Sequence, residues 1–191
     1  MSRTSLKVEL LSHTPHPDEV VATGARMCYS SAGVEDLIRG VAEKDQSKYL
    51  QRIVDMGHLS PIEHASFTFA VEGVSRALLA QITRHRIASF SVQSQRYVSQ
   101  ANQMGSFPYI LPPSIEALGP EAVAEYDRQM ETMQKWYNQW QAKLGAKGEK
   151  SNEDARFVLP NACETRMVIT MNARELMHFF SLRCCNRAQW E

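Results

Sequence analysis

The sequence predicts a single domain in which strands and helices are mixed. Its 191 residues fit one domain and are enough to enclose a hydrophobic core. Apolar and polar side chains alternate along residues 66–72 and 166–172, which is typical of strands with one buried face. Along residues 120–144 apolar side chains instead return every three or four positions, which predicts one long helix.

Short elements are expected in the first third of the chain. Residues 6–10 alternate apolar and polar side chains and indicate a first strand. Residues 46–56 place apolar side chains on one helical face, and Gly57 is expected to end this helix. A polar turn with two histidines and a glutamate follows at residues 58–64.

The strand at residues 66–72 is expected to end at Gly73, which has no side chain to pack in a sheet. Ser75 can cap a following helix at residues 76–83, because its hydroxyl can accept a hydrogen bond from a free backbone N–H. The Arg-His-Arg run at 84–86 then lies where the chain leaves regular structure. Functional side chains are common in such places.

Residues 105–120 hold four prolines and two glycines, and they predict a surface loop within the domain. Pro120 and Glu121 then open the long helix, since proline is favoured in a first helical turn. The apolar seam of this helix predicts a face packed on the core, with a subunit interface as the alternative. The seam comprises Val123, Tyr126, Met130, Met133, Tyr137, Trp140 and Leu144.

The last third of the chain predicts a helix, a strand and a second helix. Residues 152–159 form the first helix, which Pro160 stops. After the strand at 166–172, Asn172 can cap the next helix with Glu175 as its reciprocal partner. The strand's apolar face consists of Met167, Ile169 and Met171, and that of the helix of Leu176, Phe179, Phe180 and Leu182.

The charge balance argues against a nucleic-acid-binding protein. The chain has 21 basic and 21 acidic side chains, whereas such proteins usually carry a net basic domain or stripe. No apolar run reaches the roughly 20 residues of a membrane helix, and the start of the chain lacks the apolar core of a signal peptide. We therefore expect a cytoplasmic protein that binds a small anion, with neither nucleic acid nor membrane as a partner.

The chain has four cysteines, Cys28, Cys163, Cys184 and Cys185. None forms a Cys-x-x-Cys pair or a zinc-binding spacing, so we expect reduced thiols packed as small apolar groups. His58, Glu63 and His64 are conceivable metal ligands, but they lack the helical His-Glu-x-x-His arrangement. The sequence therefore predicts no metal site.

The most informative segment is the Arg-His-Arg run at 84–86, followed by Ser94 and Arg96. So many cations are costly to bring together unless an anion lies among them, and the rigid donors of arginine suit phosphate oxygens. The segment therefore predicts a site for a phosphorylated ligand. We expect further arginines around it, in a pocket formed by Arg84, Arg86, Arg96, Arg156, Arg174, Arg183 and Arg187.

Other chemistries have less support in the sequence. Ser94 has His85 nearby as a base, but no Gly-x-Ser-x-Gly elbow surrounds it, so we expect Ser94 to donate a hydrogen bond to phosphate. No glycine-rich dinucleotide fingerprint or Walker loop occurs. One arginine of the pocket could stabilise negative charge that develops on a ring carbonyl during a reaction.

The chain resembles the flavin-dependent thymidylate synthases in five motifs that occur in the family's order. The pattern Arg-His-Arg, seven residues, Ser, any residue, Arg at 84–96 is similar to the family's signature. The other motifs are Gly57-His58-Leu-Ser-Pro-Ile-Glu-His64, Arg156-Phe-Val-Leu-Pro160, Asn172-Ala-Arg174, and Leu182-Arg183 with Ala188-Gln-Trp-Glu191.

This resemblance implies a fold and a reaction. The fold is α+β, in a homotetramer that holds FAD and substrate between subunits. The reaction is the methylation of dUMP to dTMP, with a methylene from 5,10-methylenetetrahydrofolate and a hydride from reduced FAD, which NADPH reduces. The flavin then carries the chemistry for which classical thymidylate synthesis uses a cysteine nucleophile.

The resemblance also implies roles for individual residues. Arg183 is the implied catalytic residue, lying against the uracil and polarising it. The implied dUMP-binding residues are Gln81, Arg84, Ser94, Gln95, Arg96, Arg156 and Arg183. The implied FAD- and folate-binding residues are His58, Ser60, Glu63, Arg84, His85, Arg86, Asn172 and Arg174.

Two departures from the family's pattern stand out. Relatives often carry Asn-Glu near positions 91–92, where this chain has Ser91-Val92, so a polar contact to substrate is expected to be missing. The family usually continues with more helix beyond the position of Glu191, and a truncated C-terminus with weakened activity and assembly is the corresponding expectation.

Two alternatives to the flavoenzyme remain open from the sequence. A nucleic-acid-binding module would use the same arginines, with Phe90 and Tyr97 interleaved for base stacking. A non-catalytic flavin or nucleotide sensor would be a relative that has lost the reaction.

Overall fold

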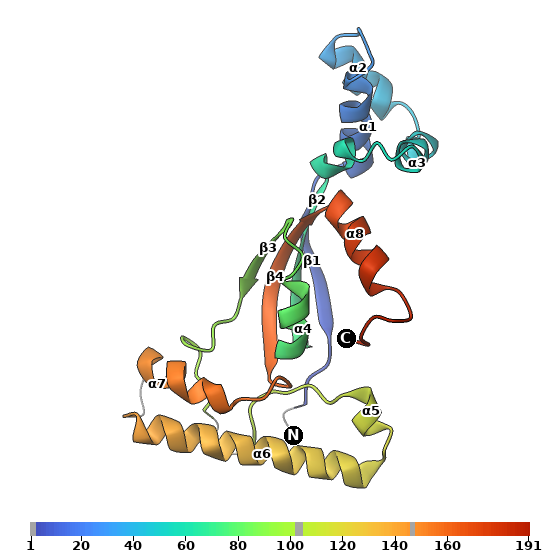
Figure 1. Cartoon of the computed structure of the whole chain (residues 1–191). Helices are drawn as coiled ribbons and strands as arrows, with labels where there is room; N and C mark the ends of the chain where they lie inside the picture. Colours follow the sequence, from blue (N-terminus) through green and yellow to red (C-terminus); the bar gives the residue numbers. More distant parts are fainter. Residues whose placement is uncertain (1–2, 102–104, 146–147) are drawn as a thin grey trace.

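The computed structural model describes residues 3–101, 105–145 and 148–191. Its centre is an antiparallel sheet with the strand order β1-β2-β4-β3. The strands are β1 (Lys7–His13), β2 (Ser66–Ser75), β4 (Glu164–Asn172) and β3 (Ala88–Val92). Helices lie at the two ends of this sheet and on one of its faces, so the chain has an α+β fold, as the sequence predicts (Figure 1).

Two helices pack on one face of the sheet, α4 (Arg76–Ile82) and α8 (Ala173–Arg183). The predicted apolar face of β4 lies under them, with Met167, Ile169 and Met171 buried. This cluster holds α4 and α8 on the same face of the sheet (Figure 1).

The remaining helices gather at the two ends of the sheet (Figure 1). One end holds α1 (Pro17–Met27), α2 (Val34–Ala42), α3 (Ser47–Asp55) and the 3-10 helix η1 (Ser60–His64). The other end holds α5 (Pro113–Glu116), α6 (Pro120–Lys143), α7 (Glu149–Ala155) and the 3-10 helix η2 (Arg156–Val158). Each end has its own small apolar cluster.

The face of the sheet opposite α4 and α8 is hollowed and open to solvent. Lys7, Ala70, Ser91 and Val168 line this hollow. All of β1 is exposed, so the alternation at residues 6–10 predicts the strand correctly but not a buried face. Alternation reports two different faces of a strand, and it cannot report whether anything in the same chain covers either of them.

The prediction that Gly73 ends the second strand is wrong. The strand continues to Ser75, and Gly73 lies within it at φ 71°, where the pairing with β4 shifts register. The glycine marks a bulge, because a residue with a side chain rarely adopts this backbone conformation. A Cβ atom here would also lie 1.8 Å from the carbonyl oxygen of Ser5.

Both predicted helix caps are present. Ser75 Oγ accepts a hydrogen bond from Leu78 N at 3.0 Å, and Asn172 Oδ1 accepts one from Glu175 N at 2.8 Å. The carboxylate of Glu175, expected to return to the backbone of Asn172, contacts the ring of His85.

The segment at 105–120 is more than a surface loop. It contains helix α5, and Phe107, Tyr109 and Ile110 within it are buried. Tyr109 donates a hydrogen bond to Asp127 on α6, and Arg3 forms an ion pair with the same carboxylate at 2.6 Å. The segment therefore packs against α6 together with the start of the chain.

Only part of the predicted apolar seam of α6 is buried. Met130 and Tyr137 are buried as predicted, but Trp140 and Leu144 are exposed. Gln134 and Gln141 are buried in their place, and Gln141 Nε2 donates to the Tyr137 hydroxyl at 3.1 Å. An α-helix has 3.6 residues per turn, whereas the apolar residues of the predicted seam repeat every 3.5 residues. The seam therefore drifts around the helix, away from the face that is buried.

Several other expectations need correction. The helix expected at 152–159 is α7 followed by η2, and the sequence analysis missed α1, α2 and β3. Of the four free cysteines only Cys163 is buried. The three exposed thiols do not pack as apolar groups.

Candidate functional site

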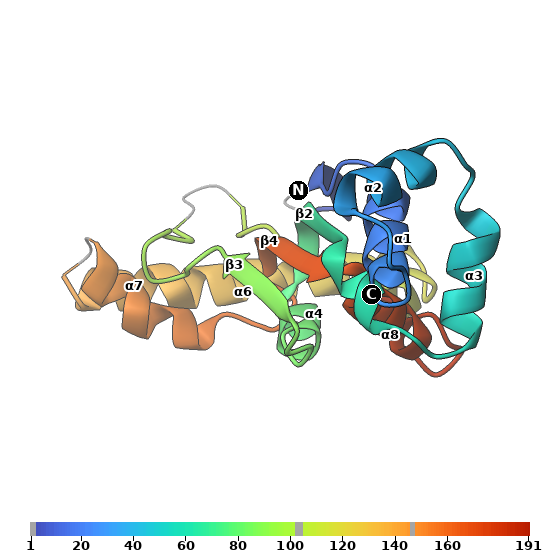
Figure 2. The ribbon, with the colours of Figure 1, turned by 90° about the horizontal axis from the view of Figure 1, so that it is seen from above.

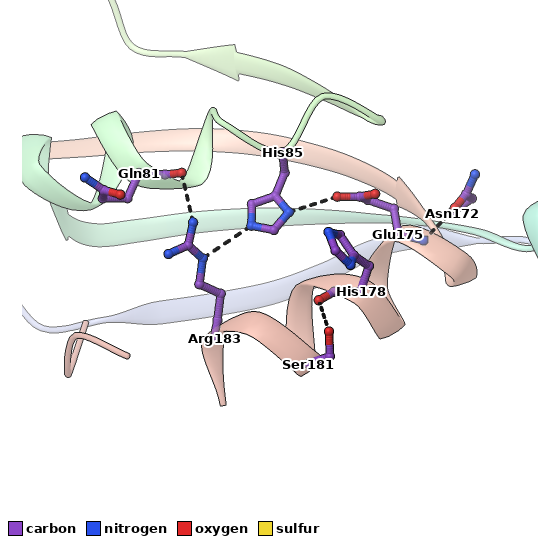
Figure 3. Close-up of polar contacts among 7 residues, drawn as sticks. All are labelled: Gln81, His85, Asn172, Glu175, His178, Ser181 and Arg183. Atoms are coloured by element: carbon purple, nitrogen blue, oxygen red, sulfur yellow. Dashed lines mark hydrogen bonds and ion pairs between the residues drawn. The ribbon is translucent and has the colours of Figure 1, made fainter. Parts of the chain in front are cut away.

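The site is built around His85, which follows α4 directly, and around the helix α8. His85 is buried, and its Nδ1 lies 2.9 Å from Glu175 Oε1. Arg183, at the end of α8, donates from Nε to His85 Nε2 at 3.3 Å and from Nη2 to the Gln81 carbonyl at 3.4 Å. Figure 3 shows these contacts as one continuous line from Glu175 to Gln81. The chain thus brings together three residues to which the resemblance assigns roles, Gln81, His85 and Arg183.

A cavity of about 470 Å³ lies on the Arg183 side of this line. We name it the Arg183 cavity, and Gln81, Arg183, Arg187 and Gln189 are among its lining residues. The segment after α8 forms one wall, and Glu191 anchors that wall by accepting hydrogen bonds from Ser75 N and Oγ at 2.5 Å. The cavity therefore combines apolar lining residues with hydrogen-bond donors, a mixture that suits a planar ligand with polar edges.

A second cavity of about 500 Å³ lies on the other side, along α8. We name it the Arg174 cavity, and its lining includes Glu63, Asn172, Arg174, Glu175 and His178. Arg174 Nη1 pairs with Glu63 Oε1 at 2.5 Å. Three of the residues that the resemblance assigns to flavin and folate thus line one cavity.

The residues expected to hold the nucleotide phosphate lie elsewhere in the chain, beside α7. Arg96 Nη2 pairs with Glu149 at 2.5 Å and with Glu153 at 2.8 Å. Arg156 Nε donates to the carbonyl of Glu153 at 3.1 Å, and Ser94 Oγ accepts from Arg96 N at 3.2 Å. Gln95 is buried in the same segment, with Nε2 3.5 Å from Cys163 Sγ.

One chain therefore does not form the single arginine pocket that the sequence predicts. The segment 94–96 and Arg156 lie at α7, whereas Arg183 lies at α8, and the two helices are well separated in both views (Figures 1 and 2). Arg84 and Arg86 are exposed beyond α4, outside the two cavities.

The two remaining predicted residues lie near η1. His58 is half-buried, and its ring lies edge-on to Tyr29 at 5.9 Å between centroids. Ser60 begins η1 and is exposed. Neither lines the Arg174 cavity, although Glu63 from the same motif does.

Glu175, His178 and Glu191 belong to the site, although the sequence does not predict them there. The sequence predicts Glu175 as a capping residue, and nothing in it links Glu175 to His85, ninety positions earlier. Glu191 belongs to the Ala-Gln-Trp-Glu motif, which could have indicated it. A contact between residues so far apart in the sequence can be found only in the folded structure.

The cysteines differ in their chemistry. A hydrogen bond from the backbone of Arg187 lowers the pKa of Cys185, which lines the Arg183 cavity. Burial raises the pKa of Cys163 to about 12.

The described residues contain no cluster of three or more His, Cys, Asp or Glu side chains that could hold a metal ion. None of their helices is both long and apolar enough to cross a membrane. Of the two aromatic residues that a nucleic-acid-binding module would use for base stacking, Phe90 packs on the core and Tyr97 is exposed.

The sequence of the chain is similar to those of known proteins from one family. A family described as "Thymidylate synthase complementing protein" matches residues 9–191. The flavin-dependent thymidylate synthase of Clostridium tetani is 48% identical over 97% of this chain and 77% of its own length. That of Nitratidesulfovibrio vulgaris is 49% identical over 100% of this chain and 79% of its own length.

A solved structure shows the same fold. It is Thymidylate Synthase X from Helicobacter pylori with FAD and dUMP, and it matches with a TM-score of 0.68 at 24% identity. The match covers 97% of this chain and 86% of that chain. The motifs, the fold and these relatives agree, and the chain belongs to the flavin-dependent thymidylate synthase family.

Proposed function

We propose that this chain methylates dUMP to dTMP, with 5,10-methylenetetrahydrofolate as the methylene donor and NADPH as the reductant of FAD. The observation that carries the proposal is the position of Arg183. Its guanidinium faces a cavity and is held by two neutral acceptors, and among the described residues it has no carboxylate partner. A full positive charge is therefore available to a ligand.

This charge suits the chemistry of a pyrimidine ring. When the pyrimidine ring reacts, negative charge builds up on one of its carbonyl oxygens, and a fixed cation beside that oxygen lowers the barrier to the reaction. Gln81, which lines the same cavity, offers an amide for the polar edge of the ring. Arg183 and Gln81 would then orient the uracil and polarise it.

The residues of the Arg174 cavity fit a flavin. Asn172 and Arg174 supply donors beside apolar Leu59, Ile87 and Met177, a mixture that suits a planar ring with polar edges. When bound there, FAD would supply hydride transfer. We propose that His58, Ser60, Arg84 and Arg86 hold the rest of the cofactor and the folate beyond this cavity, whereas both ring nitrogens of His85 are engaged by Glu175 and Arg183.

The segment at α7 fits a phosphate. Both ion pairs of Arg96 use Nη2, and Nε is buried without a partner in the described part of the chain. An unpaired buried donor is costly, so it marks a place for an acceptor such as a phosphate oxygen. Ser94 and Arg156 lie beside it and complete the proposed phosphate site.

The separation of this phosphate site from Arg183 supports a homotetramer with each nucleotide site built from different subunits. The exposed strand β1 supports it too, because it leaves Val8 and Leu10 more than half exposed. Exposed apolar surface of this kind is typical of an interface. Val8 and Leu10 pair with Val71 and Phe69, so they lie at the β1 edge of the face that carries α4 and α8, and this edge is a candidate for the subunit contact.

An absorbance spectrum and an activity assay test the proposal. The purified protein should show flavin absorbance or take up FAD, and it should form dTMP from dUMP, methylenetetrahydrofolate and NADPH. Protein that binds FAD but forms no dTMP would instead support the non-catalytic sensor. The same assay with NADH tests the proposed reductant.

A further inference from the structure

The line Glu175–His85–Arg183 defines the protonation state of the histidine. A guanidinium can donate hydrogen bonds but cannot accept them. Arg183 Nε, 3.3 Å from His85 Nε2, therefore requires a lone pair on Nε2. In the neutral ring the proton must then be on Nδ1, and it points to Glu175 Oε1 at 2.9 Å. The carboxylate of Glu175 thus selects the tautomer that can accept from Arg183.

The surroundings hold Glu175 and His85 in place. Glu175 is buried, and its backbone N–H donates to the cap residue Asn172, so it occupies a fixed position in the first turn of α8. Phe179 packs edge-on against the imidazole at 5.2 Å between centroids, and His178 does so at 6.0 Å. The ring consequently has little freedom to turn away from Glu175.

The imidazole also keeps the negative charge away from Arg183. Two other arginines of the proposed site are paired directly with carboxylates, Arg96 with Glu149 and Glu153 and Arg174 with Glu63. Direct pairing with Glu175 would orient Arg183 equally well, but it would cancel much of the charge that a ligand could use. A neutral ring between them fixes the direction of the guanidinium and leaves its charge.

We propose that Glu175 is a positioning residue, which acts through His85 to aim the Arg183 guanidinium into the Arg183 cavity. This inference rests on the proposed function, since it assigns the positioning to the arginine that would polarise the uracil. It also links the two cavities, because Glu175 lines the Arg174 cavity and Arg183 lines the other. Arginine carries much rotamer freedom, so such an anchor pre-organises the cation for the reaction.

The first test is Glu175→Leu, which removes the acceptor for His85 Nδ1. We expect kcat to fall about tenfold to a hundredfold, with the KM for dUMP nearly unchanged, because the loss would fall on the transition state. Glu175→Gln retains an oxygen acceptor and should restore most of kcat. The control is Glu164→Gln, a half-buried glutamate, which contacts Gly73 N and Arg166 on the sheet and should leave kcat unchanged. A Glu175→Leu protein with the kcat of the unsubstituted enzyme would overturn the inference.

A double-mutant cycle separates positioning from general stability. In an Arg183→Ala background, Glu175→Leu should cause no further loss of turnover, since the residue that it positions is gone. Equal fold-losses in both backgrounds would show that Glu175 acts only on the fold, and would contradict the inference.

Nitrogen NMR of histidine-labelled protein supplies a readout that does not depend on activity. His85, assigned by the loss of its signals in His85→Gln, should show a protonated Nδ1 and an unprotonated Nε2 near neutral pH. A proton on Nε2 would overturn the inference even in a fully active enzyme. If the unsubstituted protein forms no dTMP but shows this tautomer, the proposed reaction fails while the contact between Glu175, His85 and Arg183 stands.

Discussion

At the scale of single residues, what distinguishes the arginines of this chain is the partner of each guanidinium. Arg96 and Arg174 are paired with carboxylates, whereas Arg183 rests on an imidazole and a carbonyl. The sequence placed all three in one predicted pocket, since residue type and motif reveal that a cation is present. They do not reveal its partner, which depends on long-range packing.

Replacement of Arg183 tests this distinction. Arg183→Ala should lower turnover by about a hundredfold or more, because it removes the cation proposed to stabilise developing charge. FAD retention, measured by absorbance after gel filtration, should change far less, since Arg183 does not line the Arg174 cavity. Arg128→Ala, on the exposed side of α6, is the control and should change neither quantity. Equal losses of turnover and FAD would show that the assigned role is wrong.

Tyr109 gives a prediction on pH dependence. Burial, and then its hydrogen bond to Asp127, raises the pKa of Tyr109 from 10.0 to about 12. A raised pKa in the folded state stabilises the protein fully below pH 10, and this contribution is lost as pH rises from 10 through about 12.

Urea unfolding across this pH range is the measurement. The unfolding free energy of the unsubstituted protein should fall more steeply between pH 10 and 12 than that of Tyr109→Phe. Tyr29→Phe, at an exposed position, should keep the steeper fall. Parallel curves for the protein and Tyr109→Phe would contradict the prediction.

At the scale of elements, the sequence predicts the features that depend on neighbouring residues, but it does not predict those that depend on contacts between distant parts of the chain. Caps at Ser75 and Asn172 were found because a cap needs only residues three positions apart. Ala88, Phe90 and Val92 alternate as β3 requires, but the strand is too short for its pattern to stand out beside the cationic motif. The bulge at Gly73 was misread as a strand end, because glycine is common to both.

This bulge gives a prediction on stability. Gly73→Ala should destabilise the protein by more than about 1 kcal/mol, because the residue has a positive φ and the new Cβ would meet the backbone of Ser5. Gly40→Ala is the matched control, since nothing lies within 4 Å of its Cβ position inside α2. The control should stabilise by about 0.5–1 kcal/mol through its higher helix propensity. Urea unfolding midpoints measure both, and equal shifts would disprove the bulge as the cause.

At the scale of the whole molecule, the elements divide the proposed nucleotide site. The helices α4 and α8 carry Gln81 and Arg183, whereas the phosphate residues Ser94, Arg96 and Arg156 lie at α7. The motifs identify both groups, but sequence order cannot say which copy of the chain supplies each. Association of several copies of the chain explains both the nucleotide site that is incomplete in one chain and the hollowed face of the sheet.

Mixing two inactive variants tests whether one nucleotide site uses two subunits. Arg183→Ala and Arg96→Ala should each abolish most turnover as homo-oligomers. If Arg183 and Arg96 of one site come from different subunits, random co-assembly leaves both intact in about a quarter of the sites. Co-expressed, differently tagged variants, purified through both tags, should therefore recover about that fraction of the unsubstituted turnover. Mixed oligomers without recovered activity would place both arginines of a site in one subunit, and the separation of α7 from α8 would then have to close within the chain.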